Sequence, residues 1–343
     1  MSARSARVLA CTVLLAACGQ SYDPPSLINK IRVLAIRADP PVLRSTGPTT
    51  LEPLIVGVPA GEQLCQAWAF CPFAWPKDGN FRCFDPRLQS DLGTSVGATV
   101  TPAHLFKALA EAPAVFEDLG LKLPDNLSAG GGATDEPPSL EAYVLFKFAT
   151  AASEGGSCPT DVAAWLEQPC TDRDACIAGY KRLEFVTKAE DVHNNPDLTG
   201  LQIEGVDWPE GVTPTLAWYR GDPDDTFFGL SQGALEMVPT WSPESAEVIG
   251  ENVDPTATEP AKEGLLFSWF STEGDYVKQR TYDEVPENTF LPPCKDDLPV
   301  RLWLVVRDGR NGVDWLVRGA VVRKDAPAGN PLCALEPKPA GCP

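Results

Sequence analysis

The cysteines are the residues of this chain whose chemistry the sequence constrains most. Eleven occur among 343 residues. Nine follow residue 60: Cys65, Cys71, Cys83, Cys158, Cys170, Cys176, Cys294, Cys333 and Cys342. The first two clusters have spacings of five and eleven residues, unlike the close C-x₂-C pairs of zinc sites, so we expect disulfides and no metal. Because nine is odd, at least one thiol is unpaired or pairs between molecules.

One disulfide can be assigned from a turn signal. Residues 76–80 (Pro-Lys-Asp-Gly-Asn) are turn formers centred between Cys71 and Cys83. The alternating run of residues 65–71 precedes this turn, and residues 81–84 can return as its paired strand. The sequence therefore predicts a hairpin closed by a Cys71–Cys83 bond.

The first eighteen residues carry an export signal. Arg4 and Arg7 precede an apolar run over residues 8–17 that is too short to span a bilayer, and small residues then lead to Cys18. The sequence Leu-Ala-Ala-Cys at residues 15–18 resembles the bacterial lipobox. That resemblance implies cleavage before Cys18 and attachment of lipid to Cys18. Residue 19 is glycine and not the aspartate that retains lipoproteins at the inner membrane of enteric bacteria, which favours anchoring in the outer membrane. The alternative is an ordinary signal peptide with a chance cysteine.

Acidic residues dominate the rest of the chain. Without residues 1–17, 26 basic residues face 47 acidic ones, a net charge of −21. This excess repels phosphate, so we expect no nucleic-acid partner. No later run reaches the length of a membrane span, so we expect membrane contact through the N-terminal lipid alone.

Residue types that carry catalysis are sparse. The two histidines, His104 and His193, are expected on the surface, and no G-x-S-x-G, P-loop, dinucleotide-binding or H-E-x-x-H motif occurs. We therefore expect no catalytic residues, no cofactor and no enzyme. The sequence does not exclude a catalytic pair of carboxylates suited to glycoside hydrolysis, because such a pair is recognised by its separation in space.

Two acidic stretches raise the alternative of a calcium site. Asp191, Asn194, Asn195 and Asp197 lie in one, and Asp222, Asp224 and Asp225 lie in the other. Loop oxygens suit a hard cation, but neither stretch has EF-hand spacing and turns are naturally rich in Asp and Asn. We favour solvated turns.

The tryptophans raise a carbohydrate-binding alternative, because flat aromatic faces stack on sugars. Trp68, Trp269 and Trp303 lie in predicted strands and are expected in the core. Four other tryptophans lie near prolines or loops, where they could be exposed: Trp75, Trp208, Trp218 and Trp241.

Short β-rich segments separated by turns run along most of the chain. Residues 31–37, 49–58, 142–148 and 182–187 read as strands of a first domain. Thr101 and Pro102 open a helical insertion, which Pro113 is expected to end.

In the second half, apolar runs on either side of residues 308–312 predict a β-hairpin over residues 300–322. In it Leu302, Leu304 and Val306 are expected to face one side, and Trp303 and Val305 the other.

These elements predict an all-β protein of two immunoglobulin-like β-sandwich domains in tandem, with a short helical insertion in the first. The sequence Val-Arg-Asp-Gly-Arg-Asn-Gly at residues 306–312 resembles the V-x-D-x-x-x-G turn of immunoglobulin-like domains of the polycystic-kidney-disease-repeat type. The expected organisation is a signal peptide (1–17), a tether that lifts the first domain off the membrane (18–30), a first sandwich with helical insertions (31–190), an interdomain segment (191–213), a second sandwich (214–323) and a Pro- and Cys-containing tail (324–343).

Across its length the chain resembles two-domain envelope lipoproteins of Gram-negative bacteria, which implies a location and no activity. We expect a non-catalytic interaction or structural module with an unknown protein or glycan partner. The alternatives are a carbohydrate-binding lipoprotein and an envelope hydrolase.

Overall fold

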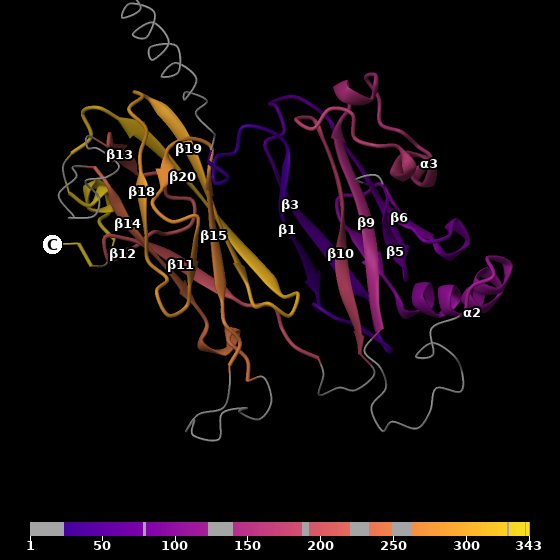
Figure 1. The fold of residues 1–343 in the computed structure, drawn as a ribbon. Coiled ribbons are helices and arrows are strands. Elements are labelled where there is room, and N and C mark those ends of the chain that lie inside the picture. The colour runs from indigo at the N-terminus through magenta and orange to yellow at the C-terminus, as the bar shows by residue number, and fades with distance from the viewer. Residues whose placement is uncertain are drawn as a thin grey trace, which may run out of the picture.

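The protein is built from two β-sandwiches that lie side by side (Figure 1). The computed structural model describes residues 24–77, 80–122, 140–186, 192–219, 233–248, 262–327, 329–339 and 341–342. The signal peptide and Cys18 lie outside these residues. None of the helices in the described ranges has the length and apolar character needed to cross a bilayer.

The first sandwich faces a three-stranded sheet against a five-stranded one. The smaller sheet has the order β1 (Arg32–Asp39), β3 (Thr49–Val56), β8 (Ala98–Val100). The larger sheet has the order β2 (Leu43–Arg44), β10 (Cys176–Val186), β9 (Leu140–Thr150), β4 (Leu64–Cys71), β7 (Ser90–Gly93). All these pairs are antiparallel except β2 with β10.

The second sandwich consists of two five-stranded sheets. One sheet has the order β12 (Val206–Asp207), β11 (Leu198–Ile203), β14 (Leu235–Trp241), β18 (Asn288–Leu291), β16 (Asp275–Tyr276). The other has the order β13 (Thr215–Ala217), β20 (Val313–Arg323), β19 (Leu298–Arg307), β15 (Leu266–Ser271), β17 (Arg280–Tyr282). Its short β13 also runs parallel to the last strand, β20. The predicted fold class, two immunoglobulin-like sandwiches in tandem, is therefore confirmed.

Each sandwich has its own apolar core. Trp68 and Phe148 lie in the first core, where their rings meet edge to face with centroids 5.1 Å apart. Trp269 and Phe267 lie in the second. A smaller cluster around Trp165 lies beneath α3 (Val162–Glu167). The expectation that Trp68 and Trp269 are core residues is confirmed.

The β19–β20 hairpin is apolar on both faces. Leu302, Leu304 and Val306 point into the second core, whereas Trp303 and Val305 point the other way, as the sequence predicts. The outward pair does not meet solvent. It packs on residues of the first sandwich and of the chain before it, forming a junction cluster: Ile28, Leu34, Ala35, Val56, Trp303, Val305 and Val313.

The expected tether and interdomain segment differ in the structure. Residues 26–28 lie along β15 of the second sandwich: the Ile28 N–H donates to the Ser271 carbonyl at 2.8 Å, and the Ser271 N–H donates to the Ser26 carbonyl at 3.0 Å. The chain therefore enters the fold at the junction, because Ile28 belongs to the junction cluster. Strands β11 and β12 occupy much of the expected linker, since their apolar residues complete the second core.

The helical insertion is longer than the sequence predicts. Helix α2 (Pro102–Asp118) continues through Pro113, which was expected to end it. Proline removes one helical hydrogen bond, but Val115 and Phe116 beyond it are buried against a small cluster that includes Leu88. Packing of this second half therefore keeps the helix intact.

The segment between Cys71 and Cys83 forms a separate two-stranded sheet. Strand β6 (Asn80–Cys83) pairs with β5 (Ala74–Lys77), not with β4 as expected, because β4 already lies between β9 and β7. The side chains of residues 74–81 lie outside the described part.

Candidate functional site

The turn between β19 and β20 is built around one carboxylate. Asp308 Oδ1 accepts hydrogen bonds from the Arg310 N–H at 2.7 Å and the Gly312 N–H at 2.9 Å. Gly309 and Asn311 have a φ of 81°, which a glycine and an asparagine tolerate. The side chain of Asp308 thus adds two hydrogen bonds to the backbone bond from the Asp308 N–H to the Gly312 carbonyl at 3.4 Å, and it fixes the position of residues 309–312.

This turn fastens the second sandwich to the first. The Lys181 ammonium on β10 donates to the Asn311 carbonyl at 2.7 Å. Asn195 links the two sandwiches directly: its Nδ2 donates to the Ala38 carbonyl at 2.7 Å, and its Oδ1 accepts from the Val313 N–H at 2.9 Å. We call residues 308–312 with Lys181 and Asn195 the interdomain clasp.

Charged groups surround the clasp. Arg37 on β1 donates to Asp314 on β20 at 2.9 Å, and its guanidinium lies 4.9 Å from the centre of the Trp315 ring. Arg310 donates to the buried Glu263 at 2.9 Å. Burial raises the pKa of Glu263, and the hydrogen bond from Arg310 opposes that rise. An apolar junction with a polar rim holds the two sandwiches in one arrangement.

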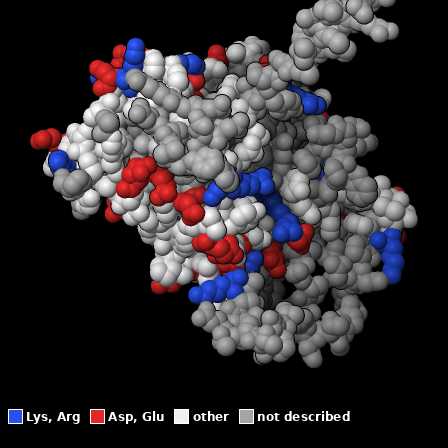
Figure 2. Space-filling view, turned by 60° about the vertical axis from the view of Figure 1, so that its left-hand side comes forward, with Lys and Arg blue, Asp and Glu red and all other residues white. Residues whose placement is uncertain are grey.

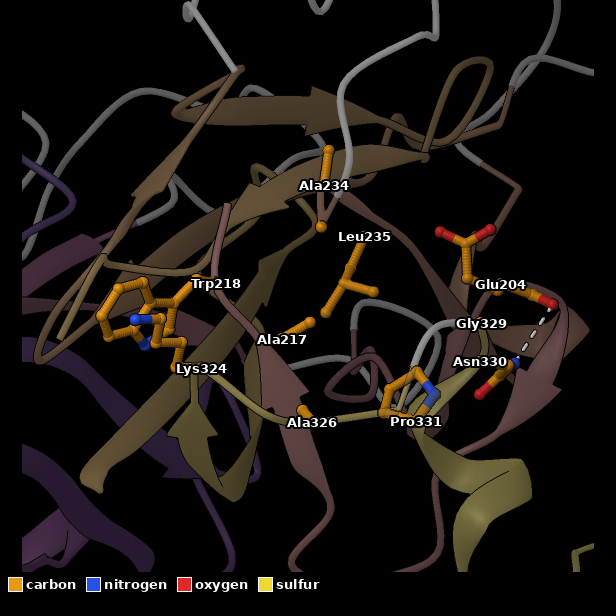
Figure 3. Close-up of a pocket in the computed structure, with 11 residues that line it drawn as sticks. Glu204, Ala217, Trp218, Ala234, Leu235, Lys324, Ala326, Gly329, Asn330 and Pro331 are labelled. Atoms are coloured by element: carbon orange, nitrogen blue, oxygen red, sulfur yellow. Dashed lines mark hydrogen bonds between the residues drawn. The ribbon is translucent and has the colours of Figure 1, made fainter. Parts of the chain in front are cut away.

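A cavity of about 490 Å³ lies at the opposite end of β20 (Figure 3). Ten residue steps separate Val313 at the clasp from Arg323 near the cavity, or roughly 33 Å of strand. The cavity wall comes from the end of β13, the start of β14 and the chain after β20. Its lining residues include Glu204, Trp218, Leu235, Lys324, Asn330 and Pro331.

Trp218 and Lys324 form one side of this cavity (Figure 3). The Lys324 ammonium lies 5.8 Å from the centre of the Trp218 ring, and the indole N–H donates to the Lys295 carbonyl at 3.0 Å. On the other side, the Glu204 carboxylate accepts from the Glu236 N–H at 2.7 Å. Asn330 donates to the Ile203 carbonyl at 2.7 Å. The cavity therefore presents an aromatic and cationic wall opposite polar groups that the backbone holds in place.

The structure pairs eight cysteines. The bonds are Cys65–Cys158, Cys71–Cys83, Cys170–Cys176 and Cys333–Cys342. Among the described cysteines Cys294 alone is free, and its thiol donates to the Tyr219 carbonyl at 3.0 Å. Four disulfides indicate a protein of an oxidising, extracytoplasmic compartment.

The acidic stretches considered for calcium fall partly outside the described residues, as Asp191, Asp222, Asp224 and Asp225 do. The described members of the first stretch serve other contacts. Asn195 belongs to the clasp, and the Asn194 side chain donates to Glu247 at 3.0 Å. The Asp197 N–H donates to the Ser245 hydroxyl at 2.9 Å. In the described ranges no three His, Cys, Asp or Glu side chains are grouped to hold a metal ion.

The histidines serve the fold. His104 lies on α2, where its Nδ1 accepts from the Thr101 N–H at 3.1 Å and so caps the helix. Burial, and secondarily Lys107, lowers the pKa of His104. The expectation of a surface position is wrong for His193, which is 2% exposed. It is covered because its Nε2 donates to the Arg310 carbonyl at 2.8 Å beside the clasp.

The tryptophans that are buried are not all those that the sequence predicts to be in a core. Trp303 is buried as expected, but in the junction cluster and not in a sandwich core. Trp208, whose position beside a proline left exposure open, is 1% exposed because it fills the second core while its N–H donates to the Val212 carbonyl at 2.9 Å. Trp218 and Trp241 are partly buried, and the side chain of Trp75 lies outside the described part.

Sequence reasoning missed Lys181 in β10 and Lys324 after β20, because a single lysine carries no spacing signal. Asn195 was considered only as a cation ligand. One signal pointed to the junction: residues 302–306 are apolar without interruption, which is typical of a strand buried on both faces.

Figure 2 shows how charge is distributed over one face. Acidic side chains form several separate groups there, and a larger basic group lies among them. Basic residues are thus gathered locally in a chain whose formal net charge is −19.

No protein-family model and no curated protein matches the chain. Among solved structures, the fibronectin(III)-like modules of CbhA from Clostridium thermocellum are similar over 86% of this chain and 98% of theirs, with 6% identity and a TM-score of 0.20. That score is too low to bear on function, so the fold assignment rests on the strand order given above.

Proposed function

We propose that this protein is a lipid-anchored, non-catalytic interaction module of the bacterial envelope, and that the cavity beside Trp218 contacts its partner. The observation that carries the proposal is the position of this cavity. It lies at the far end of β20 from the clasp, so a partner can occupy it without disturbing the junction.

The chemistry of the cavity favours recognition. Among the described residues that line it, the one carboxylate belongs to Glu204 and accepts a hydrogen bond from the Glu236 N–H, and Asn330 donates to backbone carbonyls. Groups held in this way are suited to orienting a ligand, whereas proton transfer needs a group that is available to the substrate. Trp218 and Lys324 supply contact area and one positive charge.

The membrane part of the proposal rests on Cys18. Cys18→Ala should block maturation and move the protein from the membrane to the soluble fraction. Membrane fractionation with N-terminal analysis of the mature chain tests this. Retention in the membrane, with a mature N-terminus at another residue, would contradict it.

The binding part is tested by quantitative capture from detergent-solubilised membranes, followed by mass spectrometry. A partner recovered with the wild-type chain should be reduced at least about tenfold by Trp218→Ala and by Lys324→Glu. Arg173→Glu makes the same charge change at an exposed site in the first sandwich and should leave recovery unchanged. Equal recovery with all three variants would contradict a role for the cavity.

A glycan is the second candidate partner, because Trp218 is a partly exposed indole in a polar cavity. Lys324 lies over that ring and would have to move for a sugar to stack on it. Binding of neutral oligosaccharides that strengthens in Lys324→Ala and disappears in Trp218→Ala would favour this candidate over a protein partner.

A further inference from the structure

A second cavity, of about 440 Å³, lies between the two sandwiches. Val33, Ala35 and Ile36 of β1 line it on one side, and Val313 of β20 lines it on the other. Phe146 and Ile177 extend the apolar wall, and Lys181 and Arg307 supply positive charge. The wall is therefore apolar with two cations, one from each sandwich.

Both cations donate to neutral oxygens, although the carboxylate of Asp308 is close enough to favour the charged form of Lys181. Lys181 donates to the Asn311 carbonyl, and Arg307 donates to the Leu34 carbonyl and to the Ser268 hydroxyl at 3.2 Å. Neither forms an ion pair with a carboxylate in the described part of the chain. A guanidinium has five N–H donors and an ammonium three, so both retain donors after these contacts. Burial lowers the pKa of Lys181, Asp308 opposes this shift, and repulsion from Arg307 and Arg182 adds to it.

A smaller hollow of about 220 Å³ adjoins the same arginine. Arg307 lines both spaces, and the exposed Arg280 of β17 lines the second beside Trp269 and Phe270. The charge of Arg280 adds to the repulsion that Arg307 experiences. Three cations thus follow one another along the junction of a chain that is otherwise strongly acidic.

We propose that the groove between the sandwiches binds a small organic anion, a carboxylate carried on an apolar body. A carboxylate would accept from Lys181 and from the guanidinium of Arg307, two cations whose printed hydrogen bonds go to carbonyl and hydroxyl oxygens. The apolar body would lie against Val33, Ile36 and Phe146. A strongly hydrated dianion such as inorganic phosphate fits such walls less well, because burying it costs more solvation. This inference is independent of the proposed partner site at Trp218.

The test is calorimetric titration of the full-length protein in detergent micelles with hexanoate, with hexanamide as its neutral counterpart and a micelle blank. We expect saturable binding of one hexanoate. We expect binding at least about tenfold weaker for hexanamide, for inorganic phosphate and in Lys181→Met, the loss of one charge-assisted hydrogen bond. Lys324→Met removes a lysine from the other cavity and should leave hexanoate binding unchanged.

Arg307→Gln could loosen the junction, so Arg280→Gln is the second variant. Arg280 is exposed, and its loss should weaken hexanoate binding severalfold while the thermal unfolding midpoint stays that of the wild type. No saturable hexanoate binding would overturn the proposal. So would equal binding of hexanamide or phosphate, or unchanged hexanoate binding in both Lys181→Met and Arg280→Gln.

Discussion

Gly312 lies directly against the carboxylate of Asp308. Its N–H donates to Oδ1 at 2.9 Å, and a Cβ at this position would collide with Oδ2. The φ of Gly312 is not among the positive values, which occur at Gly309 and Asn311. Close approach of a side-chain oxygen, and not backbone conformation, therefore requires glycine at the end of the V-x-D-x-x-x-G turn.

Gly312→Val should destabilise the second sandwich by about 1 kcal/mol or more, because the added methyl groups displace Asp308 from the turn. Chemical denaturation measures the free energy of unfolding. Gly264→Ala is the matched control, since a Cβ there meets no atom within 4 Å and its φ is not positive. A Gly312 variant as stable as the Gly264 variant would show that Asp308 does not hold the turn.

Lys181 should give the junction a dependence on pH. Burial lowers the pKa of Lys181 from 10.5 to about 8; Asp308 opposes this shift, and Arg307 and Arg182 add to it. Between these two pH values the unfolded chain holds more protons than the folded one, so the free energy of unfolding rises with pH in this window. The rise should reach up to about 1 kcal/mol per pH unit relative to Lys181→Met. Thermal unfolding of both proteins from pH 8 to 10.5 measures it, and parallel curves would exclude the effect.

Lys147 should stabilise the packing of helix α3 on the first sandwich. Its ammonium is buried, and it donates to the Trp165 carbonyl at 3.1 Å and the Gln168 carbonyl at 3.0 Å at the end of α3. Lys147→Met leaves both carbonyls without this donor and should cost roughly 1–3 kcal/mol of unfolding free energy. Lys107→Met, at an exposed position of α2, should change stability by less than about 0.5 kcal/mol. Equal stabilities of the two variants would refute the role of Lys147.

The cysteine pairing gives a chemical prediction. Without reductant, an alkylating reagent should modify Cys294, which is exposed, and none of the eight paired cysteines. Non-reducing peptide mapping should recover Cys71 joined to Cys83, and replacing both by alanine should cost about 3 kcal/mol. A free thiol at either residue, or a bond from either to another cysteine, would refute this pairing.

The sequence was sufficient for features that depend on neighbouring residues. The β19–β20 hairpin follows from two apolar runs around a glycine-containing turn, and its side-chain directions follow from strand geometry. The burial of Trp68 and Trp269 follows from their positions in alternating strands. In each case the signal lies within about ten residues of chain.

Features that join distant residues were not predicted. Helix α2 continues past Pro113 because Phe116 packs on Phe84 and Phe73, far from it in sequence. The junction places Leu34 and Val305 in one apolar cluster, and nothing local to either residue indicates the other. The cavities beside Trp218 and beside Lys181 likewise are lined by segments that meet only in the folded chain.

The attachment of residues 26–28 to β15 determines how the molecule bears mechanical load. Leu27 pairs with Ser271 in parallel, and the Ser26 hydroxyl donates to Asp275 at 3.4 Å. Tension applied to the N-terminus acts first on these few contacts with the second sandwich, and only afterwards on β1 of the first. Tension at this end would thus reach the second sandwich before the first, and the short stretch at Ser271 would yield first.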